Sequence, residues 1–204
     1  MSDLSLSRYD AVIFDMDGTL VDSTAPHLDA WEIICDRYGY PCDRQFMATL
    51  SGVPTAGTVE ILNQKFGLDH PVEPLSFEKE ALFLKLCQTP RRFESVYQIL
   101  VEQAAIKPVA VGTGASREHA LAQLKPLDML HRLSALVTAC DVLHGKPHPE
   151  TFLTAAQHIG IVPNRCVVFE DTAIGMQAAA AAGMDCVRVA EGEIVDVVRA
   201  NELF

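Results

Sequence analysis

The chain has 204 residues, of which 49% are hydrophobic and 21% are charged, and its formal net charge at pH 7 is −11. This composition indicates a globular protein with a substantial core and excludes extensive disorder. The negative charge argues against binding to nucleic acid or anionic membranes, and no run of about 18 apolar residues predicts a membrane span.

The N-terminus and the cysteines indicate the compartment. Residues 1–9 are polar and mixed in charge, unlike a signal peptide. None of the six cysteines belongs to a CxxC pair, and several lie in apolar runs: Cys35, Cys42, Cys87, Cys140, Cys166 and Cys186. We therefore expect a cytoplasmic protein with reduced, largely buried thiols, and neither a disulfide nor a zinc framework.

The first predicted strand, residues 10–14, leads directly into two carboxylates, Asp15 and Asp17. If the strand continues through Asp17, the two side chains share a face and repel each other unless a cation or a shared proton intervenes. A divalent metal would relieve this repulsion, and a carboxylate held beside it could attack a phosphorus atom.

The next segment, residues 22–90, has the pattern of consecutive helices with proline-containing breaks between them. The predicted helices cover residues 28–38, 44–50, 58–66 and 77–87. Four helices without a strand indicate an inserted helical cap at residues 23–90, with linkers at 23–26 and 89–92. Residues 1–22 and 91–204 would then form the core domain.

After the cap, four further strands are predicted at residues 108–112, 135–139, 166–169 and 186–189. They are short and apolar on both faces, and helical patterns at 117–124, 149–159 and 173–182 separate them. Gly183 suits the end of the last helix. The alternation predicts an α/β fold with a doubly wound parallel sheet and an inserted helical cap.

Polar residues follow the carboxyl end of each of the first four predicted strands, which is where α/β sheets bind ligands. Beyond the two aspartates, these residues are Thr113, Gly114 and Ala115 after the second strand, Lys146 after the third, and Glu170 and Asp171 after the fourth. Acids, a hydroxyl, a lysine and a glycine-containing turn suit a phosphoryl group bound together with a hard cation.

These residues, in this order, resemble the four motifs of the haloacid dehalogenase superfamily. Residues 14–20 read FDMDGTL, Thr113 follows a hydrophobic strand, Lys146 begins KPHPE, and residues 167–171 read VVFED. The helical insert also stands where that family has its first type of cap. The resemblance implies a Rossmann-like core and Mg²⁺-dependent hydrolysis of a small phosphorylated metabolite through an aspartyl phosphate.

The resemblance also implies roles for the acids. Asp15 would be the nucleophile, and Asp17 the general acid and then the base, which would require a raised pKa for Asp17. Mg²⁺ would be held by the Asp15 carboxylate, the Asp17 carbonyl and Asp171, and Glu170 would be either a further ligand or a partner of the ligands. An acid at position 17 favours ester hydrolysis over dehalogenation.

The remaining motif residues would bind the phosphate. Thr113 and the amides of Gly114 and Ala115 would hold its oxygens, and Lys146 would offset negative charge.

Within the superfamily, the cap is similar to that of the β-phosphoglucomutase and sugar-phosphate phosphatase branch. His27, Trp31 and Gly52 match cap residues of that branch, so His27 and Gly52 are substrate-binding candidates. His27 could equally be a packed residue, and Trp31 is expected in the cap core. Thr55 stands where the mutase carries an arginine for a second phosphate, for which Lys79 or Arg117 could substitute.

We therefore expect a phosphatase acting on fructose 1-phosphate or similar sugar phosphates. The alternative is a phosphomutase, and a catalytically inactive interaction protein is less favoured. A monomer is expected, because the cap must move freely. The histidines show no zinc-like spacing, and His144 and His148 are expected to be loop residues.

Overall fold

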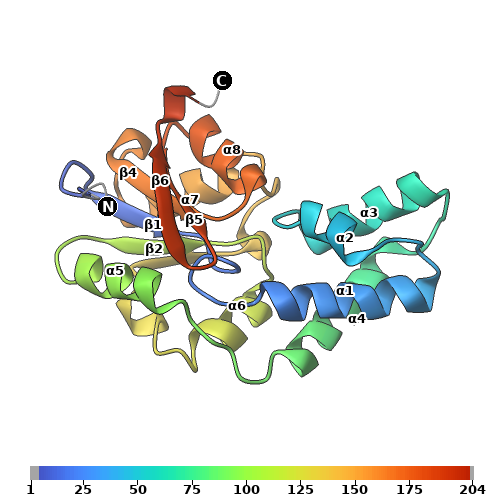
Figure 1. Ribbon diagram of the computed structural model, residues 1–204. Coiled ribbons are helices and arrows are strands. Elements are labelled where there is room, and N and C mark those ends of the chain that lie inside the picture. Colours follow the sequence, from blue (N-terminus) through green and yellow to red (C-terminus); the bar gives the residue numbers. More distant parts are fainter. Residues whose placement is uncertain (1–4, 203–204) are drawn as a thin grey trace.

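The computed structural model describes residues 5–202, so the first four residues of the N-terminal segment 1–9 lie outside the described range. Its centre is a six-stranded sheet with the strand order β3-β2-β1-β4-β5-β6 (Figure 1). The strands are β1 (Ala11–Phe14), β2 (Val109–Gly112), β3 (Ala135–Val137), β4 (Cys166–Glu170), β5 (Asp185–Ala190) and β6 (Glu193–Val198). The first five strands are parallel, as predicted.

Helices cover both faces of the sheet because successive strand residues alternate between two apolar layers. On one face, Val12 and Phe14 of β1 pack with residues of α5 (Glu94–Ala104) and α6 (Arg117–Leu124). On the other face, Ala11 and Ile13 pack with residues of α7 (Glu150–Ile159) and α8 (Ala173–Ala181). This is the predicted doubly wound α/β arrangement.

Three elements differ from the prediction. Strand β6 pairs antiparallel with β5, so the sheet is mixed; its residues are mostly half-exposed or exposed, which left no buried apolar run to recognise. Helix α5 was not predicted, although Val96, Tyr97 and Leu100 form an apolar face at helical spacing. The third strand ends at Val137, because the side chain of Asp141 accepts hydrogen bonds from the backbone and hydroxyl of Thr138 and closes a short turn.

The insert between β1 and β2 begins with four helices, which lie to one side of the sheet in Figure 1. They are α1 (Thr24–Tyr38), α2 (Arg44–Thr49), α3 (Thr55–Phe66) and α4 (Val72–Leu86). A separate apolar cluster that includes Trp31, Ile34 and Leu62 holds them together. The outgoing linker predicted at residues 23–26 is mostly helical, since Pro26 stands in the first turn of α1, where no backbone donor is needed.

The chain leaves and re-enters the core region at one place. Val21 forms an antiparallel bridge with Arg92, and the backbone N–H of Asp22 donates to the carbonyl of Arg91 at 2.9 Å. This contact agrees with boundaries of the helical insert near residues 22 and 91. The division of the chain into a core domain and a cap domain stays a prediction.

Short 3-10 turns complete the described elements: Leu130–Arg132, Ala139–Asp141, Pro163–Arg165 and Ala200–Glu202. Within residues 5–202, every helix is too short or too polar to span a lipid bilayer.

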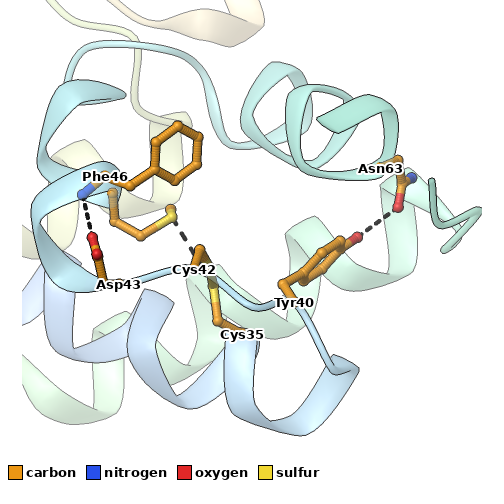
Figure 2. Close-up of a disulfide and its surroundings, with 7 residues drawn as sticks. Cys35, Tyr40, Cys42, Asp43, Phe46 and Asn63 are labelled. Atoms are coloured by element: carbon orange, nitrogen blue, oxygen red, sulfur yellow. Dashed lines mark hydrogen bonds between the residues drawn. A yellow bond between two sulfur atoms is a disulfide. The ribbon is translucent and has the colours of Figure 1, made fainter. Parts of the chain in front are cut away.

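The expectation of six reduced thiols is wrong for one pair, because Cys35 and Cys42 form a disulfide (Figure 2). Gly39 ends α1 with a φ of 70°, and the chain turns back so that the two cysteine Cα atoms are 6.5 Å apart. The separation of seven positions between Cys35 and Cys42 in the sequence did not indicate that the chain reverses direction there. In the described part of the chain, the other four cysteines are free, and Cys140 alone among these four is exposed.

Candidate active site

All the residues predicted for the site line one pocket between the carboxyl ends of the parallel strands and the helical insert. They are Asp15, Asp17, His27, Gly52, Thr113, Gly114, Ala115, Lys146, Glu170 and Asp171. Asp15 follows β1, Thr113 follows β2, and Glu170 ends β4. Because β1 lies between β2 and β4, the sheet order itself brings these three strand ends together.

The loop after β1 is a tight turn that places Asp171 beside Asp15. Gly18 has a φ of 86°, and a Cβ atom on it would lie 2.2 Å from Oδ2 of Asp171. The hydroxyl of Thr19 donates to Oδ1 of Asp171 at 2.8 Å. The residues that follow the two aspartates therefore fix an acid that lies more than 150 positions later in the chain.

Lys146 connects the buried acids. Its Nζ donates to Oδ1 of Asp15 at 2.5 Å and to Oε2 of Glu170 at 2.8 Å, and its side chain is 3% exposed. Burial lowers the pKa of Lys146, but the two carboxylates outweigh burial and raise it. Lys146 is therefore a cation in the middle of the site.

Glu170 is fully engaged by its neighbours. Its Oε1 accepts hydrogen bonds from the backbone and hydroxyl of Thr172 at 3.0 and 2.7 Å, while Oε2 accepts from Lys146.

Burial, together with crowding of the acids, raises the pKa values of two of them. Burial and the charge of Glu170 raise the pKa of Asp15 well above its usual value, despite the opposing effect of Lys146. Burial and Glu170 likewise raise the pKa of Asp171 to about 7. Oxygens of Asp15, Glu170 and Asp171 lie within 4.8 Å of one another, so the three side chains could hold one metal ion. A cation there would relieve the repulsion by Glu170, which adds to burial in raising these pKa values.

Asp17 has different surroundings from those that strand spacing predicts. Strand β1 ends at Phe14, and Asp17 lies in the loop that follows. Its Oδ1 accepts a hydrogen bond from Ser23 at 2.6 Å and lies 3.5 Å from Nε2 of His27. The same oxygen lies 3.4 Å from Nε2 of His119.

The pKa of Asp17 is not raised, as a protonated general acid would require. Burial raises the pKa of Asp17, but His119 and His27 outweigh burial and hold it well below its usual value. In the absence of substrate, Asp17 is therefore a carboxylate.

The cap side of the pocket carries a second cation. Lys79 is buried and lies 2.7 Å from Nδ1 of His27, and burial lowers the pKa of Lys79 to about 8. Burial and Lys79 lower the pKa of His27 to about 4, so this imidazole is neutral. The side chain of Arg117 is instead paired with Asp141 at 2.7 Å and does not line the pocket. Of the two substitutes considered for the missing arginine, Lys79 is the one at the site.

The phosphate-binding turn has one engaged amide. The N–H of Ala115 was expected to hold a phosphate oxygen. In this structure it donates instead to Oγ1 of Thr113 at 3.1 Å. A Cβ atom on Gly114 would meet nothing within 4 Å, so the space on that side of the residue is open.

Gly52 brings the cap loop against the core. It has a φ of 87°, and a Cβ atom on it would lie 2.7 Å from Oγ1 of Thr172. Trp31 belongs to the cap core, as expected, and also lines the pocket.

The sequence analysis did not predict roles for three residues that contact the acids of the site. Ser23 and His119 approach Asp17, and Thr19 donates a hydrogen bond to Asp171. The position of Thr19 directly after the aspartates was a usable signal. His119 lies in the first turn of a helix that was predicted to start beside the phosphate turn, and this placement was the signal for it. Away from the pocket, the exposed loop residues His144 and His148 come together with Glu150 in a group with ligand atoms within 4.8 Å.

Comparisons with known proteins agree with this geometry. Residues 12–189 match the model of the haloacid dehalogenase-like hydrolase family. The fructose-1-phosphate phosphatase YqaB of Escherichia coli strain K12 is 40% identical over 183 residues, which are 89% of this chain and 97% of the relative. The β-phosphoglucomutase of Bacillus subtilis strain 168 is 28% identical, over 90% of this chain and 84% of that protein.

A solved structure supports the fold. The crystal structure of a hydrolase from Pseudomonas syringae aligns with a TM-score of 0.78 and 26% identity, over 95% of this chain and 89% of that one. The chain therefore belongs to the family of haloacid dehalogenase-like hydrolases.

Proposed function

We propose that this protein is a Mg²⁺-dependent phosphatase that hydrolyses small sugar-phosphate monoesters through an aspartyl phosphate on Asp15. One observation carries the proposal: Lys146 holds one oxygen of the buried Asp15, while Asp171 lies beside it. This leaves the other Asp15 oxygen for attack on phosphorus. The family and the name of the Escherichia coli relative support the same reaction and substrate class.

The acidic group fits a magnesium ion. Hard oxygen ligands suit Mg²⁺, and beside burial the charge of Glu170 raises the pKa values of Asp15 and Asp171, a repulsion that a divalent cation would relieve. We assign the ion to these two carboxylates and the backbone carbonyl of Asp17. Glu170 is assigned as a partner of Lys146 and not as a metal ligand, because both of its carboxylate oxygens already accept hydrogen bonds. Bound Mg²⁺ would stabilise negative charge on the phosphoryl group.

In the first step, Oδ2 of Asp15 attacks phosphorus and the bond from phosphorus to the ester oxygen breaks. The departing oxygen takes a proton from Asp17, which becomes a carboxylate. Asp17 is ionised before substrate binds, but the negative charge of an arriving phosphate raises a neighbouring carboxyl pKa and favours its protonated form. Lys146 and the turn at Thr113 and Gly114 would stabilise the transferring group.

In the second step, Asp17 removes a proton from water, and the resulting oxygen attacks phosphorus. The bond between phosphorus and Asp15 breaks, which regenerates the nucleophile and releases phosphate. His27 and Gly52 on the cap side would contact the remainder of the substrate, while the cap limits entry of bulk water. The monomeric state and the cytoplasmic location stay predictions.

Phosphate release over a panel of sugar, polyol and nucleotide monophosphates, with and without Mg²⁺, tests the proposal. We expect Mg²⁺-dependent release that is highest for sugar phosphates, and its loss in Asp15→Asn. Release that survives in this variant would contradict a nucleophilic Asp15.

A phosphomutase is the second candidate, favoured by the buried Lys79, a cation in the cap half of the pocket that could hold a distal phosphate. Thr55 stands where the mutase carries an arginine, and this counts against a phosphomutase. Lys79 could replace the charge of that arginine but not its bidentate hydrogen bonding to a phosphate. Conversion of a hexose 1-phosphate to its 6-phosphate, stimulated by the bisphosphate, would establish the mutase instead.

A further inference from the structure

His119 brings a buried nitrogen to the residue assigned to proton transfer. The histidine stands in the first turn of α6 and is 3% exposed. Its Nε2 lies 3.4 Å from Oδ1 of Asp17, within ion-pair distance, but within residues 5–202 this nitrogen makes no hydrogen bond to that carboxylate or to any other group. A buried imidazole nitrogen without a partner is costly, so its direction toward Asp17 requires an explanation.

The polar contacts recorded between Asp17 and three neighbouring side chains all involve the same carboxylate oxygen. Ser23, His27 and His119 all approach Oδ1, at 2.6, 3.5 and 3.4 Å respectively. Oδ2 makes none of these three contacts and would be the oxygen that carries the transferred proton. Holding Oδ1 from several sides fixes the rotation of the carboxyl group and therefore the direction of Oδ2.

His119 also contacts the helical insert. The ring of Phe83 in α4 packs against two imidazoles, with centroids 3.9 Å from His27 and 4.4 Å from His119, and the two imidazoles lie 5.3 Å from each other. Ser23 and His27 lie at the start of α1, whereas His119 approaches from α6 of the core region. His119 thus approaches Asp17 from a different element than Ser23 and His27 do.

We propose that His119 is a positioning residue for proton transfer: it holds Oδ1 of Asp17 so that Oδ2 is directed at the leaving-group oxygen. The inference rests on the proposed phosphatase function. It accounts for a buried polar side chain that packing alone does not explain, since an apolar residue would fill the same space against Phe83.

Substrates with different leaving groups separate this role from a structural one. A sugar alkoxide is a poor leaving group and needs the proton, whereas p-nitrophenolate departs without one. Comparison of kcat/KM isolates the step up to the aspartyl phosphate, because the later hydrolysis is common to both substrates. The experiment measures kcat/KM for fructose 1-phosphate and p-nitrophenyl phosphate in wild type, His119→Phe, His119→Leu and His119→Gln.

We expect either apolar variant that folds to lose at least about tenfold on the sugar phosphate, and less than about threefold on p-nitrophenyl phosphate. His119→Gln, which keeps an N–H near the position of Nε2, should recover much of the loss. Asp17→Asn should show the same discrimination more strongly, and His158→Phe, which changes an exposed histidine on α7, should show none.

Equal losses on both substrates, or no loss on either, would overturn the positioning role. If wild type hydrolyses neither substrate, the proposed phosphatase function fails instead, and the two failures are distinguishable. Thermal unfolding of each variant identifies those that fold.

Discussion

The ammonium group of Lys146 lies 2.5 Å from Oδ1 of Asp15, although 131 positions separate the two residues in the chain. The contact exists because β1 and β4 are neighbours, so that Glu170 at the end of β4 can hold the same lysine. One buried cation thereby holds two buried carboxylates in fixed positions.

Removal of this cation should affect both activity and stability. In Lys146→Met, the carboxylates of Asp15 and Glu170 lose their buried partner, which costs about 3 kcal/mol when one member of such a pair is removed. We expect kcat to fall at least about a hundredfold and the free energy of unfolding to fall in urea titrations. Lys125→Met, at an exposed position, is the control, and an unchanged stability in Lys146→Met would contradict the assigned contact.

Stabilisation by Mg²⁺ should depend on pH. The pKa of Asp171, about 7, is raised above its ordinary value, so without metal the folded state holds a proton that the unfolded chain has lost. The free energy of unfolding therefore falls as pH rises from about 4 to 7, by linkage. Because Mg²⁺ binds the deprotonated carboxylates, the rise in Tm on adding Mg²⁺ should be larger at pH 8 than at pH 5.

Scanning fluorimetry at the two pH values measures this difference. Asp171→Asn should abolish the Mg²⁺ effect and, without metal, raise Tm at pH 8 by removing a repelling charge. Equal shifts in Tm at both pH values would argue against a metal bound by Asp171.

Gly18 should tolerate no side chain. A Cβ atom there would lie 2.2 Å from Oδ2 of Asp171, in addition to the strain of a φ of 86°. We expect Gly18→Ala to weaken Mg²⁺ binding at least about tenfold, and to destabilise the fold by more than the ~1 kcal/mol of backbone strain. Gly39→Ala isolates that strain, since Gly39 also has a positive φ but no neighbour within 4 Å. Similar effects of both variants on metal affinity would refute the contact with Asp171.

The disulfide of Cys35 and Cys42 should stabilise the helical insert. It closes a loop of seven positions, and the loss of so short a cross-link costs about 2 kcal/mol. We expect Cys42→Ser to unfold at a lower urea concentration than wild type without reductant, and to match wild type once dithiothreitol is added. Cys140→Ser, which changes an exposed free thiol, should leave the transition in place. A wild-type transition that reductant does not move would mean that the bridge does not contribute.

The sequence was sufficient for the parallel part of the sheet because β1, β2 and β4 are apolar on both faces, a pattern that few other structures require. It was also sufficient for the set of residues at the pocket, since parallel strands place their carboxyl ends at one edge. Strand β6 was missed because an edge strand that is partly exposed lacks this pattern.

The surroundings of each site residue could not be predicted. The pKa of Asp17 is set by His27 and His119, which come from two helices whose relative placement depends on tertiary packing. In the same way, the engagement of Glu170 by Lys146 and Thr172 depends on side-chain positions that strand order alone does not define.

The most direct test of the account is a crystal structure of the protein with Mg²⁺ and inorganic phosphate. We predict one magnesium ion bound by the carboxylates of Asp15 and Asp171, with phosphate against Thr113 and Lys146 and in line with Oδ2 of Asp15. A structure in which the two carboxylates bind no common ion, or in which Mg²⁺ occupies another site, would contradict the account.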